Sequence, residues 1–210
     1  MDTVVYILLS VTSVVGLTFI VERAWALRWG RVVPSEIEAA VESCQSPEDL
    51  PMLRRVCEKY AASPMGRLLL LAADHLDWPI AENVDAIQTR ARHEITRLER
   101  GLVVLEIIVG IAPLLGLVGT IAGMMTLFGD VGQTGLNDAG KLARGIALIL
   151  NATLMGLLIA IPSLIFWSYY SKKIENIAVE METLCDQFVR RQYRQEGRTS
   201  AKSMESVESV

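Results

Sequence analysis

Side chains that carry enzyme chemistry are scarce in this sequence. Its 210 residues include two histidines, His75 and His93, which have no ligand-spaced partners, so no metal site is expected. Its three cysteines, Cys44, Cys57 and Cys185, have no CxxC spacing, and an odd number argues against a disulfide framework. P-loop, HExxH and GxSxG motifs are absent as well. The sequence therefore predicts neither an enzyme nor a protein that holds a metal or a cofactor.

Charge is missing from three long stretches of the chain. Residues 3–21, 107–128 and 145–171 contain no Asp, Glu, Lys or Arg, and each is long enough to cross a bilayer as a helix. The hydrophobic residues, 51% of the chain, are concentrated in these runs, and the mean hydropathy of +0.36 is high for a soluble domain. The sequence thus predicts an integral membrane protein. The net charge of −4 gives no indication of nucleic-acid binding.

Strand signals are missing too, so the expected fold is all-α, with three transmembrane helices and long cytoplasmic helical extensions. Residues 3–21 lack a positively charged leader and a cleavage site, which favours a retained helix over a signal peptide. From Glu82 the helical pattern continues without interruption to Phe128, and a Gly-rich turn over 129–141 leads to the third run. Five segments are expected: the first transmembrane helix and its extension (1–31), a cytoplasmic helical region (32–100), the core with the second and third transmembrane helices (101–171), a cytoplasmic helix (172–195) and a disordered tail (196–210).

Basic residues are distributed unevenly between the segments that flank the runs. Residues 22–101 contain eleven Lys or Arg, residues 172–210 contain seven, and the loop 129–144 contains two. Because basic residues accumulate on the cytoplasmic side, we expect the N-terminus and the loop outside, and the large segment and the C-terminus in the cytoplasm. Trp25 and Trp29, after the first run, fit an aromatic belt at the cytoplasmic surface.

Two of the runs present a slender helix face with one hydroxyl near mid-membrane. In the second run this face is made of Ala112, Gly116, Gly119 and Gly123, with Thr120 on its flank and Pro113 at its edge. In the third run it is made of Ile149, Thr153, Gly156 and Ala160, and Pro162 follows in the same run. Small residues let helix backbones approach closely in a membrane. These positions are therefore candidates for packing against another helix or a partner.

Polar side chains inside the runs, and the acid that directly precedes the second run, are the candidates for an ion path. Thr120 and Thr153 could each bond back to their own helix, but two threonines beside glycine favour a polar pore or a partner groove. Asn151 lies about 200° around the helix from Thr153, and a hydrogen bond to a neighbouring helix is its simplest role. Glu106 lies about 21 Å along the axis from Thr120, so it either guards the inner mouth of a pore or extends to the interface. Since no acid, base or histidine lies in mid-membrane, the titrating group must come from another chain.

Two long motifs stand out in the second and third runs. Their sequences are APLLGLVGTIAGMM, followed by a phenylalanine, and GIALILNATLMGLLIAIPSLIFWSYY, and the stretch ERAWALRWGRVVP follows the first run. Together they resemble the ExbB/TolQ/MotA proton-channel family, most of all its ExbB branch, over nearly all of residues 1–195. The resemblance implies a pentamer of three-helix subunits in the bacterial inner membrane. At its centre would lie a dimer of single-span ExbD/TolR-like partners, whose transmembrane Asp carries the proton.

The resemblance also implies roles for single residues. The two pore threonines of the family match Thr120 and Thr153, the positions that the helical faces select. Some members have a Glu where this chain has Leu148, and Asn151, about 60° around the helix from it, would supply part of that polarity. Rotation driven by the proton-motive force would then do work on the periplasm or the outer membrane.

The expected function is therefore the channel and stator subunit of an energy-transducing complex driven by the proton-motive force. The alternative is a passive membrane scaffold or assembly protein, which would use the small faces only for packing. A membrane enzyme is disfavoured because no nucleophile–base set is present, and a solute transporter because no internal inverted repeat is found. A proton or a sodium ion would suit the two hydroxyls.

The count of basic residues predicts the topology. Reporter fusions at residues 60 and 190 are expected to give a cytoplasmic signal, and a fusion at residue 135 an external one. Paired alkaline phosphatase and fluorescent-protein fusions measure both sides. A cytoplasmic signal at residue 135 would contradict the orientation and, with it, the family resemblance.

Overall fold

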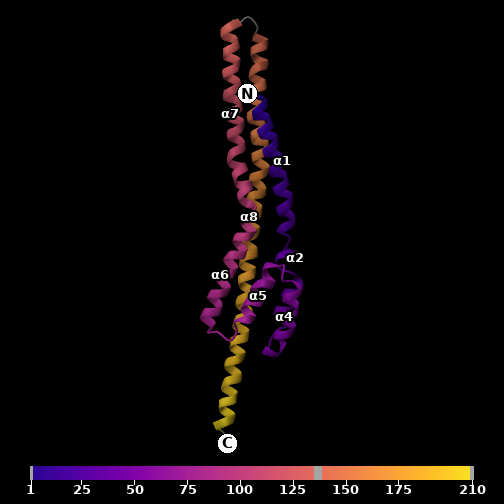
Figure 1. Cartoon of the computed structure of the whole chain (residues 1–210), viewed down its shortest axis with the longest axis vertical. Helices are drawn as coiled ribbons and strands as arrows, with labels where there is room; N and C mark the ends of the chain where they lie inside the picture. The colour runs from indigo at the N-terminus through magenta and orange to yellow at the C-terminus, as the bar shows by residue number, and fades with distance from the viewer. Residues whose placement is uncertain (1, 135–138, 209–210) are drawn as a thin grey trace. The chain divides into compact units, whose positions relative to one another are not determined.

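The computed structural model of the chain describes residues 2–134 and 139–208, and every regular element within these ranges is helical (Figure 1). The elements are α1 (Asp2–Ala26), α2 (Trp29–Val32), α3 (Ser35–Ser43), the 3-10 turn η1 (Pro47–Asp49), α4 (Leu50–Lys59), α5 (Pro64–Asp74), α6 (Ile80–Glu99), α7 (Leu102–Thr134) and α8 (Ala139–Glu208). Stretches long and apolar enough to cross a membrane lie within Thr3–Ala26, Leu102–Gly129 and Leu142–Gln195. The predicted all-α fold with three transmembrane helices is confirmed.

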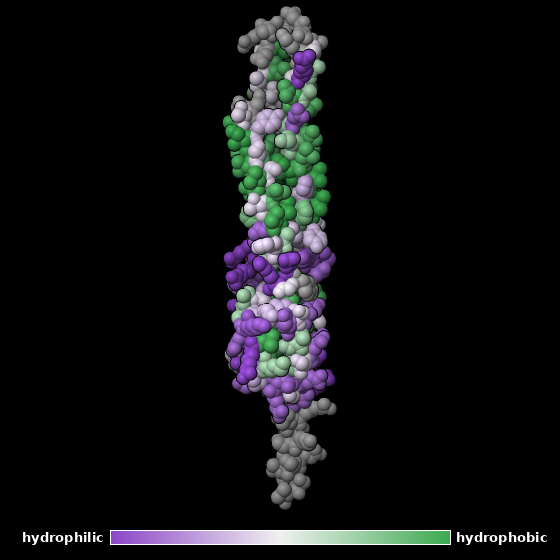
Figure 2. Space-filling view, turned by 90° about the vertical axis from the view of Figure 1, so that its right-hand side faces the viewer, coloured by the Kyte–Doolittle hydropathy of each residue, from purple (hydrophilic) through white to green (hydrophobic). Residues whose placement is uncertain are grey.

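The chain divides into two compact units. The first, Met1–Trp25 with Arg100–Ser171, contains the apolar stretches and is termed the membrane unit. The second, Ala26–Glu99 with Lys172–Val210, is termed the extramembrane unit. Figure 2 shows hydrophobic surface over the spanning helices and mainly hydrophilic surface over the helices of the second unit.

The predicted unbroken helix from Glu82 to Phe128 is wrong at one point. Helix α6 ends at Glu99 and α7 begins at Leu102. Gly101 lies at the break, and a side chain there would overlap the guanidinium of Arg23. Glycine is a poor helix former, so the position that needs the smallest residue is also the one at which the helix is interrupted.

The ends of α7 and α8 also differ from the prediction. The sequence predicts a Gly-rich turn over 129–141, but α7 continues to Thr134 and α8 begins at Ala139; residues 135–138 lie outside the described part of the chain. Each glycine costs a helix about 1 kcal/mol, which the extension of a helix that has already formed outweighs. At its other end α8 continues to Glu208, through the segment expected to be a disordered tail, where Ala, Arg, Lys, Met and Glu are good helix formers.

Helices α7 and α8 pack through their small residues. A Cβ on Gly156 would lie 2.5 Å from the carbonyl oxygen of Ala112, and a Cβ on Gly116 would lie 2.9 Å from that of Ala152. Residues late in α7 meet residues early in α8, so the two helices are antiparallel. Backbone thus touches backbone at both glycines, and neither position has room for a side chain.

Helix α1 packs against this antiparallel pair. The Cγ1 atom of Val5 would lie 2.9 Å from a Cβ on Gly119 of α7. Farther along, Tyr170 of α8 is buried and donates a hydrogen bond of 2.9 Å to the carbonyl oxygen of Ile20. Large apolar side chains on the outside of all three helices stay exposed, as contact with lipid or with further subunits requires.

The extramembrane unit has its own hydrophobic core, to which the C-terminal half of α8 contributes one face. The buried residues of this face are spaced by four and three positions: Ile177, Met181, Leu184 and Phe188. Buried residues of α3, α4, α5 and α6 join them in one cluster. Ser63 caps α5 by accepting a hydrogen bond of 3.0 Å from the backbone N–H of Gly66.

Three free cysteines, Cys44, Cys57 and Cys185, are buried in this core. Burial, reinforced by a neighbouring cysteine, raises the pKa of Cys57 and of Cys185 to about 12. Burial also raises the pKa of Cys44. The thiols are therefore protonated at neutral pH and pack as small apolar groups.

A buried ion pair joins α5 to α6 within this unit. Arg67 donates hydrogen bonds of 2.5 and 2.9 Å to the two carboxylate oxygens of Glu94, and Arg90 lies 3.2 Å from the same group. The Glu94 side chain is only 1% exposed. Burial raises the pKa of Glu94, but the hydrogen bonds from Arg67 and the charges of Arg67, Arg90 and Arg97 lower it by more. The carboxylate therefore stays ionised at neutral pH.

Substitution of the contact glycines is expected to loosen the α7–α8 pair. Gly156→Ala places a methyl group against a backbone carbonyl and should destabilise the membrane unit by about 1–3 kcal/mol. Gly110→Ala is the matched control, because no atom lies within 4 Å of its Cβ position and alanine favours a helix. Thermal unfolding of both variants in one detergent measures the difference. Equal midpoints would contradict the backbone contact.

Loss of the Glu94 charge is expected to change the acid sensitivity of the extramembrane unit. A carboxylate with a lowered pKa stabilises the fold above its ordinary value of 4.5, and this contribution is lost as the pH falls through the folded-state pKa. Glu94→Gln should therefore cost about 1–3 kcal/mol at pH 7, by leaving Arg67 without its acceptor, and flatten the stability loss below about pH 4.5. Unfolding midpoints of the Glu94→Gln variant and the wild type, measured from pH 3 to pH 7, check this expectation. Glu58→Gln, which removes an exposed carboxylate, is the control.

Candidate functional site

Thr120 and Thr153 meet where α7 and α8 pack. Their hydroxyl oxygens are in hydrogen-bonding contact. Both hydroxyls also reach the carbonyl oxygen of Gly116, at 3.0 Å from Thr120 and 3.3 Å from Thr153. These two hydroxyls and this carbonyl are termed the hydroxyl cluster. The structure therefore brings together the two residues that the helical faces select independently.

The local sequence explains how the cluster forms. Thr120 follows Gly116 by one helical turn, so its hydroxyl bonds back to that carbonyl within α7. Thr153 comes from the facing helix, and its Cα would lie 2.9 Å from a Cβ on Gly116. Only a glycine at position 116 lets the second hydroxyl reach the same carbonyl. The glycine thus determines the polar site as well as the helix packing.

The cluster lies at the edge of the helix interface. Both threonines are half-buried, whereas the glycines beside them are buried. Two hydroxyls supply two O–H donors for three contacts, so one hydroxyl donates to the Gly116 carbonyl while the other donates either to that hydroxyl or to the same carbonyl. Unused lone pairs on the hydroxyl oxygens remain to accept a proton donor or a cation. An anion could instead receive a hydrogen bond if one hydroxyl turns away from the carbonyl.

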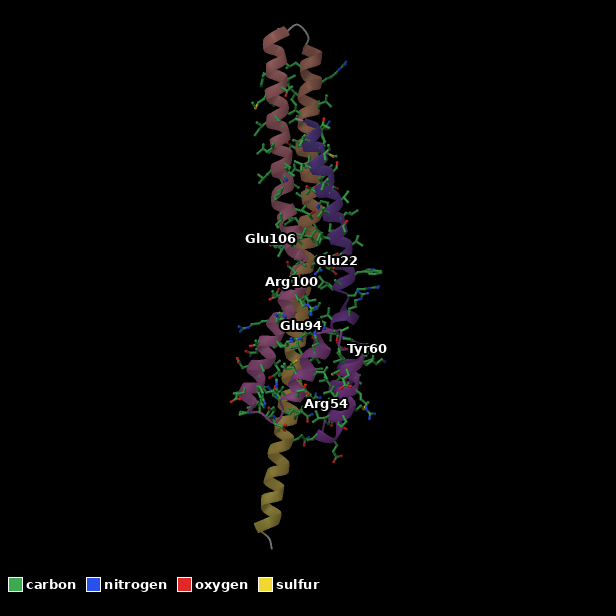
Figure 3. The ribbon with its side chains drawn as sticks, viewed as in Figure 1. Glu22, Arg54, Tyr60, Glu94, Arg100 and Glu106 are labelled. Atoms are coloured by element: carbon green, nitrogen blue, oxygen red, sulfur yellow. The ribbon has the colours of Figure 1, made fainter. Side chains whose placement is uncertain are left out.

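Two other predicted polar residues lie away from the cluster. Glu106 is exposed on α7 (Figure 3), about 21 Å along the helix from Thr120 at 1.5 Å per residue. Asn151 is exposed on α8, about 200° around that helix from Thr153. Neither side chain makes a hydrogen bond within the part of the chain that the structure describes. The structure therefore places these two residues on outer surfaces of the membrane unit.

The slender faces of α7 and α8 lie against each other. Of the two expected roles, packing against another helix or against a partner, the structure shows the first: the two faces meet through Gly116, Gly119, Gly123, Gly156 and Ala160. The reason is that two adjacent antiparallel helices with small faces complement each other within one chain. Pro113 is half-buried and Pro162 is exposed at the edges of this contact. A pocket of about 170 Å³ remains beside the contact, lined by Val5, Tyr6, Gly119, Gly123, Leu148, Ile149 and Ala152.

Sequence reasoning allowed for a bond from Thr120 back to its own helix, which the structure shows at Gly116, but not for the reach of Thr153 to the same carbonyl. A backbone carbonyl has no signature in the composition, although the spacing of Gly116 and Thr120 by four residues was available as a signal. Within the described ranges, no group of three or more His, Cys, Asp or Glu side chains could hold a metal ion.

Comparison with known proteins places these residues in a family. Residues 61–183, more than half of the chain, match the MotA/TolQ/ExbB proton channel family. The chain is 34% identical over 162 residues to an ExbB-like biopolymer transport protein of Synechocystis, a match covering 75% of this chain and 63% of that protein. It is 31% identical over 131 residues to the biopolymer transport protein ExbB of Helicobacter pylori, covering 59% of this chain and 88% of that one.

A further relative, the biopolymer transport protein ExbB of Aquifex aeolicus, is 30% identical over 101 residues, which are 48% of this chain and 68% of that protein. The chain thus spans less than two thirds of the length of the Synechocystis relative. The matched range includes Thr120, Thr153 and the glycines that bring them together. The chain belongs to the MotA/TolQ/ExbB proton channel family.

Proposed function

We propose that this protein is the channel and stator subunit of a complex that uses the proton-motive force to do work on the periplasm or the outer membrane. The observation that carries the proposal is the hydroxyl cluster, which joins two spanning helices at a half-buried edge. In this role the cluster contacts an ion-carrying carboxylate as it loads and releases its ion. The carboxylate is the transmembrane Asp of a single-span partner of the ExbD/TolR type.

The need for a partner follows from what the spans contain. The uncharged runs carry no acid, base or histidine, so this chain cannot relay a proton by titration in mid-membrane. An unassisted carboxylate there costs several kcal/mol, and each hydroxyl can return about 1.5–3 kcal/mol to a charged acceptor. Two hydroxyls on one edge are therefore enough to make a charged partner tolerable for part of a cycle.

The proposed assembly is a homopentamer around a partner dimer, in the bacterial inner membrane. The exposed apolar side chains on all three spanning helices support contacts with further subunits as well as with lipid. The N-terminus is placed outside and the C-terminus in the cytoplasm, by the distribution of basic residues. In this orientation Glu106 lies toward the cytoplasmic mouth of the path, and Asn151 supplies polarity near Leu148.

A passive scaffold is the competing function, and one observation favours it. The hydroxyls also bond within the chain, to the Gly116 carbonyl, as they would if they served only to hold α7 against α8. The two functions differ in what the loss of a hydroxyl does. A scaffold needs the shape of the threonine, whereas an ion path needs its oxygen.

Replacement of the threonines by valine separates the two functions. Thr120→Val and Thr153→Val keep the β-branched shape and remove only the hydroxyl. We expect the complex to assemble but to lose ion-driven activity tenfold or more, since about 1.5–3 kcal/mol of stabilisation is withdrawn from the charged state. Proton flux into vesicles containing equal amounts of each variant with its partner measures the effect.

Two sets of controls make this experiment specific. Thr126→Val removes a hydroxyl of the same helix that bonds back to Ala122 and lies outside the cluster, so its flux should stay near that of the wild type. Thr120→Ser and Thr153→Ser retain the hydroxyl and should restore most of the flux. Wild-type flux in the double valine variant would refute the ion-path role and leave the scaffold function.

A further inference from the structure

A cleft of about 540 Å³ opens within the extramembrane unit. Its walls come from the segment that includes α2, from the turn between α4 and α5, and from the end of α6. Tyr60 and Glu94, both labelled in Figure 3, belong to two of these walls. The cleft is separate from the hydroxyl cluster, which belongs to the membrane unit.

The charge of the cleft is strongly one-sided. Four basic side chains line it, and Glu94 is the acid among them: Arg31, Lys59, Arg67 and Arg97. Glu94 is bound by Arg67 and Arg90 and is 1% exposed, so this single buried carboxylate offsets only part of the positive charge of the cleft. Lys59 and Arg97 are exposed and make no hydrogen bond or salt bridge within the described residues, although the Lys59 ammonium lies 5.2 Å from the centre of the Tyr60 ring and the charge of Arg97 acts on Glu94. Two cations are therefore available to an anion that enters the cleft.

The position of the cleft along the chain points to the membrane surface. Its first lining residue, Ala26, is the last residue of α1, and it follows the exposed Trp25. Its last lining residue, Leu98, precedes the start of α7 at Leu102 by four residues, a chain distance of at most about 14 Å. Both edges of the cleft are thus only a few residues along the chain from a helix long and apolar enough to span a membrane.

The lining combines cations with apolar groups. Val32, Pro34 and Leu98 lie on the same walls as the basic residues. A free inorganic phosphate would use only the cations, because it has no apolar part. A phospholipid presents a phosphate to the guanidinium and ammonium groups and its glycerol and first methylene groups to the apolar wall.

We propose that this cleft binds the phosphate-bearing headgroup of an anionic phospholipid, with Lys59 and Arg97 as the contacts to the phosphate. Arg67 serves as a positioning residue, because its pairing with Glu94 joins the α5 wall to the α6 wall. Basic residues near a membrane also follow the general charge rule for topology, which needs no cleft. If the cleft is a binding site, only substitutions of residues that line it weaken lipid binding, whereas under the general rule any nearby basic residue contributes equally.

Titration of the delipidated full-length protein with lipid tests the proposal. Native mass spectrometry in detergent counts the lipids bound when phosphatidylglycerol or phosphatidylcholine is added. Inorganic phosphate is then added as a competitor. We expect saturable binding of phosphatidylglycerol, weaker binding of phosphatidylcholine and little competition from millimolar phosphate. The double variant Lys59→Ala/Arg97→Ala should weaken the phosphatidylglycerol site roughly 30-fold, at about fivefold per basic side chain.

A control with the same change in charge comes from the same two helices. Arg55→Ala/Arg92→Ala removes one basic residue from α4 and one from α6, neither of which lines the cleft, and should leave the affinity within about twofold. If both double variants weaken phosphatidylglycerol binding equally, the effect comes from the loss of positive charge in general, and the proposal is overturned. Full displacement of phosphatidylglycerol by millimolar phosphate would show that the cleft binds soluble phosphates and would overturn the proposal of a lipid site.

A measurement on the wild-type protein covers the case in which the double variant does not fold. A photoreactive phosphatidylglycerol with its reactive group near the glycerol is bound and cross-linked, and the labelled peptides are identified. We expect labels within 26–34, 59–67 and 97–98, the segments that line the cleft. Labels confined to the spanning helices would contradict the site.

Discussion

The close approach of two helix backbones at Gly116 and Gly156 is the constraint on which the membrane unit depends. With no side chain between them, α7 and α8 come near enough for a threonine of one helix to reach a carbonyl of the other. In a membrane this contact has no hydrophobic effect to drive it, so it depends on van der Waals packing and on the few hydrogen bonds at its edge. The helix packing and the hydroxyl cluster thus both result from the absence of side chains at these glycines.

The two units differ in the kind of polar group that they contain. The uncharged runs that form the spans present polarity through hydroxyls and backbone oxygen, whose cost in lipid is small when they are paired. The extramembrane unit buries a carboxylate and matches it with arginines, as the Arg67–Glu94 pair shows. A buried pair of this kind contributes little net stability but is costly to break, so it selects one arrangement of α5 and α6.

Periodicity and charge predict much of this protein from its sequence. Three uncharged runs are sufficient for the spans, and the period of 3.6 residues places Thr120 and Thr153 on small faces. The same period cannot say which helix a face meets, so the sequence left open whether each small face would pack against a helix of this chain or against a partner. The bond of Thr153 to the Gly116 carbonyl was not predicted, because every residue carries a backbone carbonyl and the sequence does not show which one the facing helix reaches.

Contacts between distant residues account for the remaining differences. The break at Gly101 depends on the side chain of Arg23, 78 positions earlier in the chain, and the Arg67–Glu94 pair spans 27 positions. The cleft is formed by three separate segments, none of which contains a recognisable motif. Local patterns predict elements and faces, whereas these features depend on how elements far apart in sequence are brought together.

The three buried cysteines of the extramembrane core have a practical consequence. Protonated and enclosed, they should be silent toward maleimides and similar reagents while the unit is folded. The natural sequence then serves as its own cysteine-free background, in which a single thiol introduced at the surface is the only one labelled. The rate at which the native thiols are slowly alkylated would then measure how often the core that encloses them opens locally.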